Sequence, residues 1–263
     1  MISDWAKLVQ LSEKGQFDEK GWPNNRSEDW KYFDLASIKS KTYKNAKSLK
    51  AARSLLPKSL GRRFVFVDGF FSPKLSDSPP SGVKLSPLDD LYSESSIQAW
   101  KKFDYETSLD PFVNLNQAQL PSGLIVEVKK SLKEPIECLY FQSSNAKLAT
   151  FPWLKIHVNP NVQVHFIENF VGGSPTSWTN QYSRIQVSRD AFVDHTRLQL
   201  DDTTNFGTTE VKVEGRYNSF SLLAGSSSSR SHVDVQFTKE HAEAQLSGFY
   251  FSQPKKQHYQ QIT

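Results

Sequence analysis

Residues 154–166 read LKIHVNPNVQVHF, two short stretches in which apolar and polar residues alternate on either side of a Pro-Asn turn. Because successive residues of a β-strand point to opposite faces, this alternation predicts two half-buried strands. Leu154, Ile156 and Val158 share the apolar face of the first strand, and Val164 lies on that of the second. The stretch therefore predicts a small β unit that buries one side.

The same unit recurs along the rest of the sequence, with a longer loop between units. The first strands centre on Val126, Ile156, Ile185, Val211 and Val233, in steps of 30, 29, 26 and 22 residues. The second strands centre on Cys138, Val164, Val193, Phe220 and Ala244, in steps of 26, 29, 27 and 24 residues. A repeat of this length, with one supersecondary unit per period, is typical of a stacked solenoid. We therefore predict a mainly β protein with a parallel β-helix core.

The alternation also predicts which later side chains fill the coil. We expect these to face the interior: Ser183, Ile185, Val187, Thr196, Leu198, Leu200, Val211, Val213, Val233, Val235 and Phe237. An antiparallel sandwich of hairpins would show similar short strands at regular spacing. Hairpins favour two-residue Asn-Gly or Asp-Gly turns, and none joins a strand pair in the repeats, so the parallel coil is favoured.

Residues 1–110 follow no such repeat and are predicted to form a helical and mixed region, with residues 111–263 as the β-helix core. Residues 89–102 are compatible with a helix. Residues 64–67 read FVFV and predict a lone strand closed by the Asp-Gly turn that follows. Residues 72–87 are rich in Ser and Pro and predict a surface connection.

Composition agrees with a folded protein, because 263 residues, 37% of them hydrophobic, suffice for a sizeable core in one or two domains. The sequence shows neither a secretory leader nor an apolar run of membrane-spanning length, so we expect a cytoplasmic protein without membrane contact. Cys138 is the only cysteine, and it alternates in phase with Ile136 and Tyr140, so we expect a buried, inert thiol. One thiol cannot hold an iron–sulfur cluster or a structural zinc by itself, because such sites take about four ligands.

The net charge of +4 is too small to require a nucleic-acid partner. Basic residues do recur in one segment, at Lys41, Lys44, Lys47, Lys50 and Arg53, followed by Arg62 and Arg63. Three-residue spacing drifts around a helix of 3.6 residues per turn, so these charges spread over a surface. A solvated face is the favoured interpretation, and we expect no nucleic acid.

Candidate chemistry is sparse. His157 and His165 on paired strands, with Glu168 nearby, could form a metal site, although surface histidines on strands are commoner. Residues 225–230 read GSSSSR, lack the ending of a phosphate loop and suggest a flexible corner. The remaining candidates are Asp194 beside His195, the separate carboxylates Asp201, Asp202, Glu210 and Glu214, and the aromatic trio Phe249, Tyr250 and Phe251, expected to pack in the core and at a corner. We nominate no catalytic, cofactor-binding or metal-binding residue.

Residues 26–32 read RSEDWKY and suit the start of a helix, with Ser27 as N-cap and Trp30 packing beneath it. The segment also resembles the N-terminal signature of the SufB/SufD family of iron–sulfur cluster assembly proteins, and within it the SufD branch. The likeness continues along nearly the whole chain, through FVFVDGFFS (64–72), PFVNLNQA (111–118), IENF (167–170), RIQVSRDAFVDHTRLQ (184–199), SFSLLAGSSSSR (219–230) and LSGFYF (246–251).

The resemblance implies a right-handed parallel β-helix between helical N-terminal and C-terminal regions, in a scaffold subunit that is not itself an enzyme. Such a subunit pairs with the paralogous SufB and works with a SufC ATPase, and the cluster is assembled with the partner subunit rather than bound by this chain alone. The implied function is support of de novo cluster formation and of iron acquisition, and self-association stays open. Because the family is longer, we expect a chain truncated at its C-terminal end, without the interface residues for cluster assembly and unable to bind SufC alone.

Two other classes of function stay open. A carbohydrate-active β-helix enzyme shares the predicted architecture but would need clustered acids along one groove. A basic nucleic-acid-binding module would use the lysine-rich segment and would bind in a strongly salt-dependent way.

Overall fold

A computed structural model of the protein describes residues 14–15, 17–19, 21–23, 30–31, 35–46, 51–88, 110–119, 122–143, 147–226, 228–252 and 256–263. The helices with defined bounds are α2 (Ala36–Lys39), the 3-10 helix η2 (Arg53–Leu55) and α4 (Pro111–Gln119). None of the helices in these ranges has the length and apolar character needed to cross a lipid bilayer. Strands make up most of the rest.

The strands form two sheets. In spatial order the first sheet contains β4 (Val83–Pro87), β5 (Leu124–Val128), β8 (Trp153–Val158), β10 (Trp178–Val187), β12 (Thr204–Val213), β14 (Ser228–Phe237) and β16 (Gln257–Ile262), with β1 (Lys44–Asn45) and β7 (Leu148–Thr150) off this path. The second sheet contains β3 (Phe70–Phe71), β2 (Arg62–Val67), β6 (Ile136–Gln142), β9 (Gln163–Gly172), β11 (Phe192–Gln199), β13 (Arg216–Leu223) and β15 (Glu243–Tyr250).

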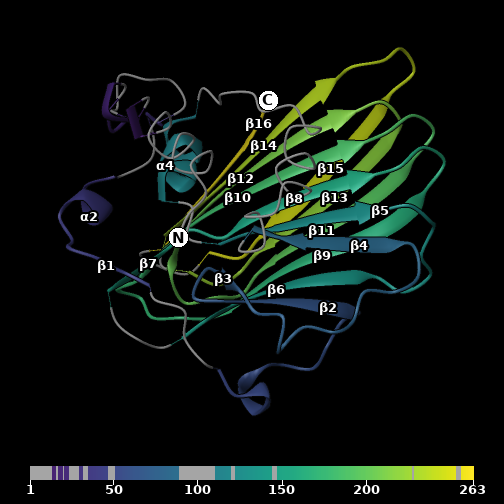
Figure 1. Ribbon diagram of the computed structural model, residues 1–263. Helices are drawn as coiled ribbons and strands as arrows, with labels where there is room; N and C mark the ends of the chain where they lie inside the picture. Colours follow the sequence, from purple (N-terminus) through teal and green to yellow (C-terminus); the bar gives the residue numbers. More distant parts are fainter. Residues whose placement is uncertain are drawn as a thin grey trace.

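Strand direction decides between the two predicted architectures. All pairings among the described strands from Leu124 onward are parallel. From β8 to β16 the chain contributes strands to the two sheets alternately, so that the sheets lie as two layers of neighbouring arrows (Figure 1). A coil with one strand of each sheet per turn produces this pattern. The arrangement is therefore consistent with a parallel β-helix, and the antiparallel sandwich is wrong.

The register of the first sheet stacks one apolar side chain of each turn on the next. Ile156 lies opposite Val126 and Ile185, and Ile185 lies opposite Val211. All four side chains are at most 1% exposed, so the first strands of the predicted repeat are confirmed. The predicted centre of the next strand, Val233, is displaced by two residues, because Val211 of β12 lies opposite Val235 of β14.

Two N-terminal strands complete the sheets. The strand predicted at residues 64–67 is confirmed within β2, but its isolation is wrong, because β2 pairs in parallel with β6 and places Phe64 opposite Cys138. Part of the connection predicted over residues 72–87 is also a strand, since β4 pairs antiparallel with β5. The two sheets thus include strands from residues 1–110 as well as from residues 111–263. The domain boundary between these two ranges stays a prediction. The helix expected over residues 89–102 lies outside the described residues.

Helix α4 packs on the first sheet beside β10 and β12 (Figure 1). The ring of Phe112 lies 4.8 Å from that of Trp30 and 4.9 Å from that of Phe206, measured between centroids. Asp110 precedes the helix, and its carboxylate accepts a hydrogen bond from the Phe112 N–H at 2.8 Å, which caps the first turn. Trp30 is 4% exposed, so its predicted burial is confirmed, whereas the Ser27 cap lies outside the described residues.

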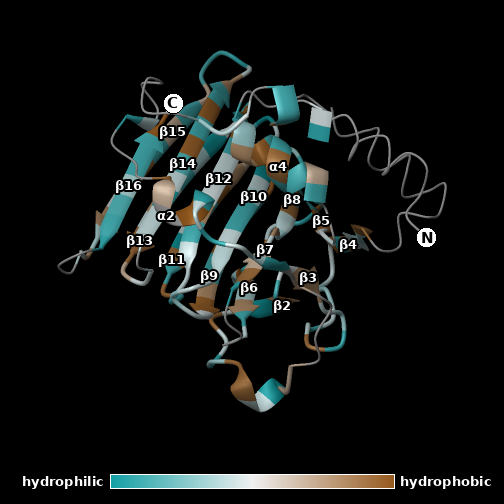
Figure 2. Cartoon of the chain, turned by 90° about the vertical axis from the view of Figure 1, so that its left-hand side faces the viewer, coloured by the Kyte–Doolittle hydropathy of each residue, from teal (hydrophilic) through white to brown (hydrophobic). Residues whose placement is uncertain are grey.

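The interior face of β11 differs from the prediction. Thr196 and Leu198 are half-exposed and Leu200 is 48% exposed, so the expectation that they fill the coil is wrong. The register with β9 sets the phase, because Val193 lies opposite Val164 and both are buried. The alternate residues that follow Val193 are polar and nevertheless buried. Figure 2 shows that hydrophilic residues also extend along β10 and β16.

Candidate functional site

Polar side chains fill part of the interior of the later turns. Along β11 the inward positions after Val193 are His195, Arg197 and Gln199, which are 3%, 2% and 0% exposed. Glu168 on β9 lies opposite Arg197 and is completely buried. A buried charge is costly unless it is paired and hydrogen-bonded, so these side chains must satisfy one another.

Glu168 is the centre of this network. One carboxylate oxygen accepts hydrogen bonds from the Tyr140 hydroxyl at 2.8 Å and the Ser183 hydroxyl at 2.5 Å. The other oxygen lies 3.3 Å from Nε2 of His195 and 3.7 Å from Nη1 of Arg197. Nδ1 of His195 lies 2.8 Å from the hydroxyl of Tyr217 on the next strand. The network therefore joins five strands, β6, β9, β11 and β13 of the second sheet and β10 of the first.

These contacts shift two ionisation equilibria. Burial alone raises the pKa of Glu168, but the hydrogen bond from His195 and the attraction to His195 and Arg197 outweigh it and lower the pKa to about 2. Burial, together with the negative charge of Glu168, raises the pKa of Tyr140 well above its usual value. At neutral pH the centre thus holds a carboxylate that accepts from a neutral phenol.

Arg197 adds two further contacts with the first sheet, on β10 and β12. Its Nη1 donates to Oε1 of Gln181 at 2.6 Å, and its Nη2 donates to Oδ1 of Asn205 at 3.1 Å. The guanidinium also lies 4.2 Å from the ring centroid of Phe170. Gly207 provides the space, because a Cβ there would lie 2.3 Å from Nη2 of Arg197.

Asp201 ends the network at the turn that follows β11. One of its oxygens accepts hydrogen bonds from the Asn205 amide, at 3.0 Å, and from the Thr203 hydroxyl. Burial raises the pKa of Asp201 despite these bonds and the attraction to Arg197. The polar interior, defined here as Tyr140, Glu168, Gln181, Ser183, His195, Arg197, Asp201, Asn205 and Tyr217, therefore fastens the two sheets together through hydrogen bonds and charge pairs.

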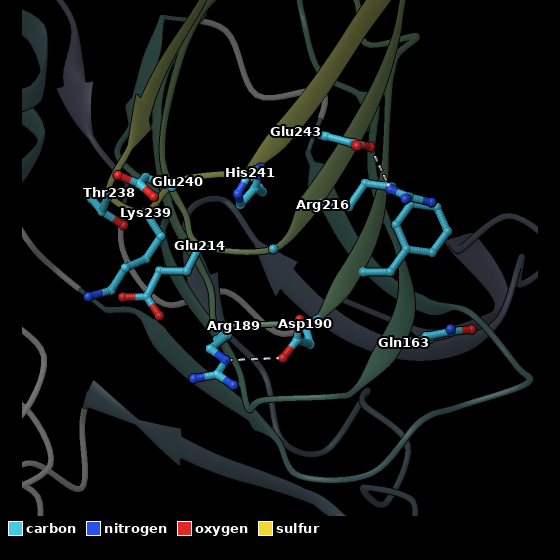
Figure 3. A pocket seen from close by; sticks show the side chains of 13 residues that line it. Gln163, Arg189, Asp190, Glu214, Arg216, Thr238, Lys239, Glu240, His241 and Glu243 are labelled. Carbon is cyan, nitrogen blue, oxygen red and sulfur yellow. Dashed lines mark hydrogen bonds and ion pairs between the residues drawn. The ribbon is translucent and has the colours of Figure 1, made fainter.

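A second feature is an open groove along the turns between the sheets (Figure 3). Its volume is about 840 Å³, and its wall holds the ion pairs Arg189–Asp190, at 3.2 Å, and Arg216–Glu243, at 3.0 Å. Glu214, Lys239, Glu240 and His241 also line it. The groove presents charges of both signs to solvent.

The sequence candidates for metal binding do not meet. His157 projects from the outer face of the first sheet and contacts Gln186 at 3.1 Å, whereas His165 lies on the outer face of the second sheet and contacts Thr196 at 2.9 Å. Glu168 points into the interior between them. Within the described ranges no group of three or more His, Cys, Asp or Glu side chains is placed to hold a metal ion.

Asp194 and His195 also separate, because adjacent residues of β11 face opposite ways. Asp194 is half-exposed and accepts from Asn218 at 3.3 Å, while His195 is buried. Cys138 is 1% exposed as predicted, and burial, with the negative charges of Glu168 and Glu137, raises the pKa of its thiol well above its usual value. Such a thiol is a poor nucleophile.

The structure also places the aromatic trio and two of the basic residues named from the sequence. The trio Phe249, Tyr250 and Phe251 is 54–60% exposed, so its predicted packing in the core and at a corner is wrong for this chain. Arg62 and Arg63 are engaged in ion pairs with Glu134, at 3.3 Å, and Glu137, at 2.7 Å. These two arginines are therefore paired within the chain rather than available to an external polyanion.

The polar interior was missed by the sequence interpretation, although the signal was present. Glu168 follows Val164 and Phe166 at the same two-residue spacing, and Arg197 follows Val193 in the same way. In a strand, that phase places a charged residue on the buried face. The position of Glu168 and Arg197 in the two-residue alternation, rather than their charge, therefore predicts that both side chains are buried.

Comparison with known proteins shows what the chain is similar to. Residues 140–263 match the family described as SUF system FeS cluster assembly, SufBD core domain. An iron–sulfur cluster assembly SufBD family protein of Synechocystis sp. is 27% identical over 243 residues, which cover 83% of this chain and 53% of that relative. This chain thus spans about half the length of the curated relative. Residues 140–263 are thus similar to the core domain shared by SufB and SufD proteins, at a level that does not separate SufD from SufB.

Proposed function

We propose that the chain serves as a SufD-type scaffold subunit, without catalytic activity of its own, in an iron–sulfur cluster assembly complex. It pairs with a SufB homologue and works with a SufC ATPase, supporting de novo cluster formation and iron acquisition. The cluster is cargo that is assembled together with the partner subunit. The match of residues 140–263 to the SufBD core domain supports this proposal most directly.

The two-sheet architecture supports a scaffold role. The strands from β5 to β16 keep a continuous parallel register, and the core positions of each turn lie over those of the last. A coil of this kind holds its outer side chains in fixed positions over a long face, which suits docking of a partner. We further propose that the coil is a right-handed parallel β-helix.

Co-expression tests the proposal. The tagged chain is produced together with the SufB, SufC and SufD homologues of the same genome, and an unrelated parallel β-helix protein carries the same tag as the control. We expect the SufB homologue to copurify with this chain in equal amount and to be absent from the control. Copurification with a SufD homologue instead of SufB would contradict the SufD assignment, and retention of neither would contradict the scaffold function.

The groove in Figure 3 bears on the alternative of a carbohydrate-active enzyme. It contains the carboxylates of Asp190, Glu214, Glu240 and Glu243, but those of Asp190 and Glu243 are paired with arginines. The scaffold proposal predicts no cleavage of polyuronides with or without calcium. Turnover that is lost in Glu214→Gln would favour the enzyme.

A further inference from the structure

A small cavity lies at the edge of the polar interior, between β6, β10 and the turn after β11. Gln142, Thr150, Thr179 and Asp201 contribute its polar wall, and the stacked rings of Tyr140 and Phe170 contribute to its apolar wall. The volume open to a water molecule is about 10 Å³. This is about the space that one water requires.

Two buried atoms at this cavity have no hydrogen-bond partner in the described part of the chain. They are Nε2 of Gln142, which is a donor, and Oδ1 of Asp201, which is an acceptor. The two residues are 6% and 2% exposed, respectively. The neighbouring polar atoms are already engaged. Oε1 of Gln142 accepts from Thr179 at 2.6 Å, and Oδ2 of Asp201 accepts from Asn205 at 3.0 Å. A buried donor or acceptor without a partner lowers the stability of the fold, so we expect a ligand to pair with both atoms.

The pair of free atoms defines the chemistry of that ligand. An amide N–H of Gln142 repels a cation, and the carboxylate of Asp201 repels an anion. The ligand must therefore be neutral, must accept one hydrogen bond and donate another, and must fit the space of a single small molecule. We propose that the cavity binds one water molecule, which accepts from Nε2 of Gln142 and donates to Oδ1 of Asp201.

The bound water adds a second link between β6 and the polar interior, beside that of Tyr140. Asp201 is joined through Asn205 to Arg197, and Arg197 lies beside Glu168. Gln142 is the last residue of β6, two positions after Tyr140. The water therefore closes a hydrogen-bonded path from β6 through the turn after β11 to the centre of the network. It also gives Asp201 the additional donor that a buried carboxylate requires.

Crystal structures of three proteins at about 1.5 Å resolution or better test the proposal: the unchanged chain, Gln142→Met and Gln163→Met. Gln142→Met keeps the length of the side chain and removes the donor, while Gln163 is an exposed residue and serves as the matched control. We expect one full-occupancy water within about 3 Å of Nε2 of Gln142 and Oδ1 of Asp201 in the unchanged chain and in Gln163→Met, and its loss in Gln142→Met.

Two further measurements keep the test decisive if Gln142→Met fails to fold. Crystals of the unchanged chain are soaked in thallium(I), which reports monovalent cations by anomalous scattering. In solution, cross-relaxation between water and the side-chain amide of Gln142 reports a long-lived bound water. We expect no thallium peak and a clear water signal. A thallium peak at the cavity, an empty cavity or the absence of the solution signal would overturn the proposal.

Discussion

Replacement of Glu168 by Gln tests the polar interior most sharply, because the substitution keeps the shape of the side chain and removes its charge. The carboxylate accepts hydrogen bonds from Tyr140 and Ser183 and lies 3.7 Å from Nη1 of Arg197. A glutamine retains one acceptor oxygen but presents N–H groups to some of these donors. Arg197, 2% exposed, also loses a counter-charge.

Two independent estimates of the effect agree. Removing one partner of a buried ion pair costs about 3–5 kcal/mol. The pKa of Glu168 falls from 4.5 to about 2 in the folded chain, and at about 1.4 kcal/mol per unit this shift corresponds to roughly 3 kcal/mol of stabilisation at neutral pH. For a chain of this size we expect the melting temperature of Glu168→Gln to drop by about 6–12 °C.

The dependence on pH gives a second signature. Because the pKa of Glu168 is lower in the folded than in the unfolded chain, its stabilisation is present above about pH 4.5 and is lost as the pH falls towards 2. The free energy of unfolding of Glu168→Gln should therefore fall less steeply than that of the unchanged chain between pH 4.5 and 2.

Urea unfolding followed by circular dichroism at several pH values measures both effects. Glu127→Gln is the matched control, because Glu127 forms a partly exposed pair with Lys129 at 3.4 Å and should contribute under about 1 kcal/mol. A Glu168→Gln variant as stable as the control, or one with the unchanged acid dependence, would refute the reasoning.

Three further predictions concern packing and reactivity. Asp110→Ala removes the cap of α4 and the partner of buried Arg230, 3.2 Å away, so it should cost about 3–5 kcal/mol in urea unfolding. The control Asp18→Ala, which breaks an exposed pair with Lys14, should cost under about 1 kcal/mol, and equal losses would contradict this prediction. Gly207→Ala places a Cβ 2.3 Å from Nη2 of Arg197 and should lower the free energy of unfolding by about 1–3 kcal/mol. In an Arg197→Met background the same substitution should cost much less, and an undiminished cost there would show that the clash does not involve Arg197. The thiol of Cys138 is 1% exposed with a raised pKa, so iodoacetamide should label it within minutes in urea and not over hours in the folded chain, and mass spectrometry that finds rapid native labelling would disprove its burial.

The predicted coil depended on local information that the sequence carries at each turn. Leu154, Ile156 and Val158 alternate in phase, and the same pattern returns at the period of the coil. These signals sufficed for the parallel stacking of β8, β10 and β12. They did not place β2 and β4 in the sheets, because a short isolated strand shows no repeat and takes its partner from tertiary contacts.

The polar interior and α4 escaped prediction for a shared reason, since both bury polar residues that satisfy one another. On α4 the buried Asn116 amide donates to the carbonyls of Pro152 and Asn180 at 3.1 and 2.7 Å. On β11 the buried Arg197 donates to Gln181 and Asn205. Reading polarity as exposure places such residues outside, and only the partners in space show that they lie inside.

Backbone nuclear Overhauser contacts in the perdeuterated chain test the parallel coil most directly, because they report which strands lie side by side and in which direction. The structure predicts that Ile185 contacts Ile156 on one side and Val211 on the other, with the sequential pattern of a parallel ladder. Contacts of Ile185 with residues of β11 in an antiparallel ladder would contradict the coil and, with it, the scaffold that the proposed function requires.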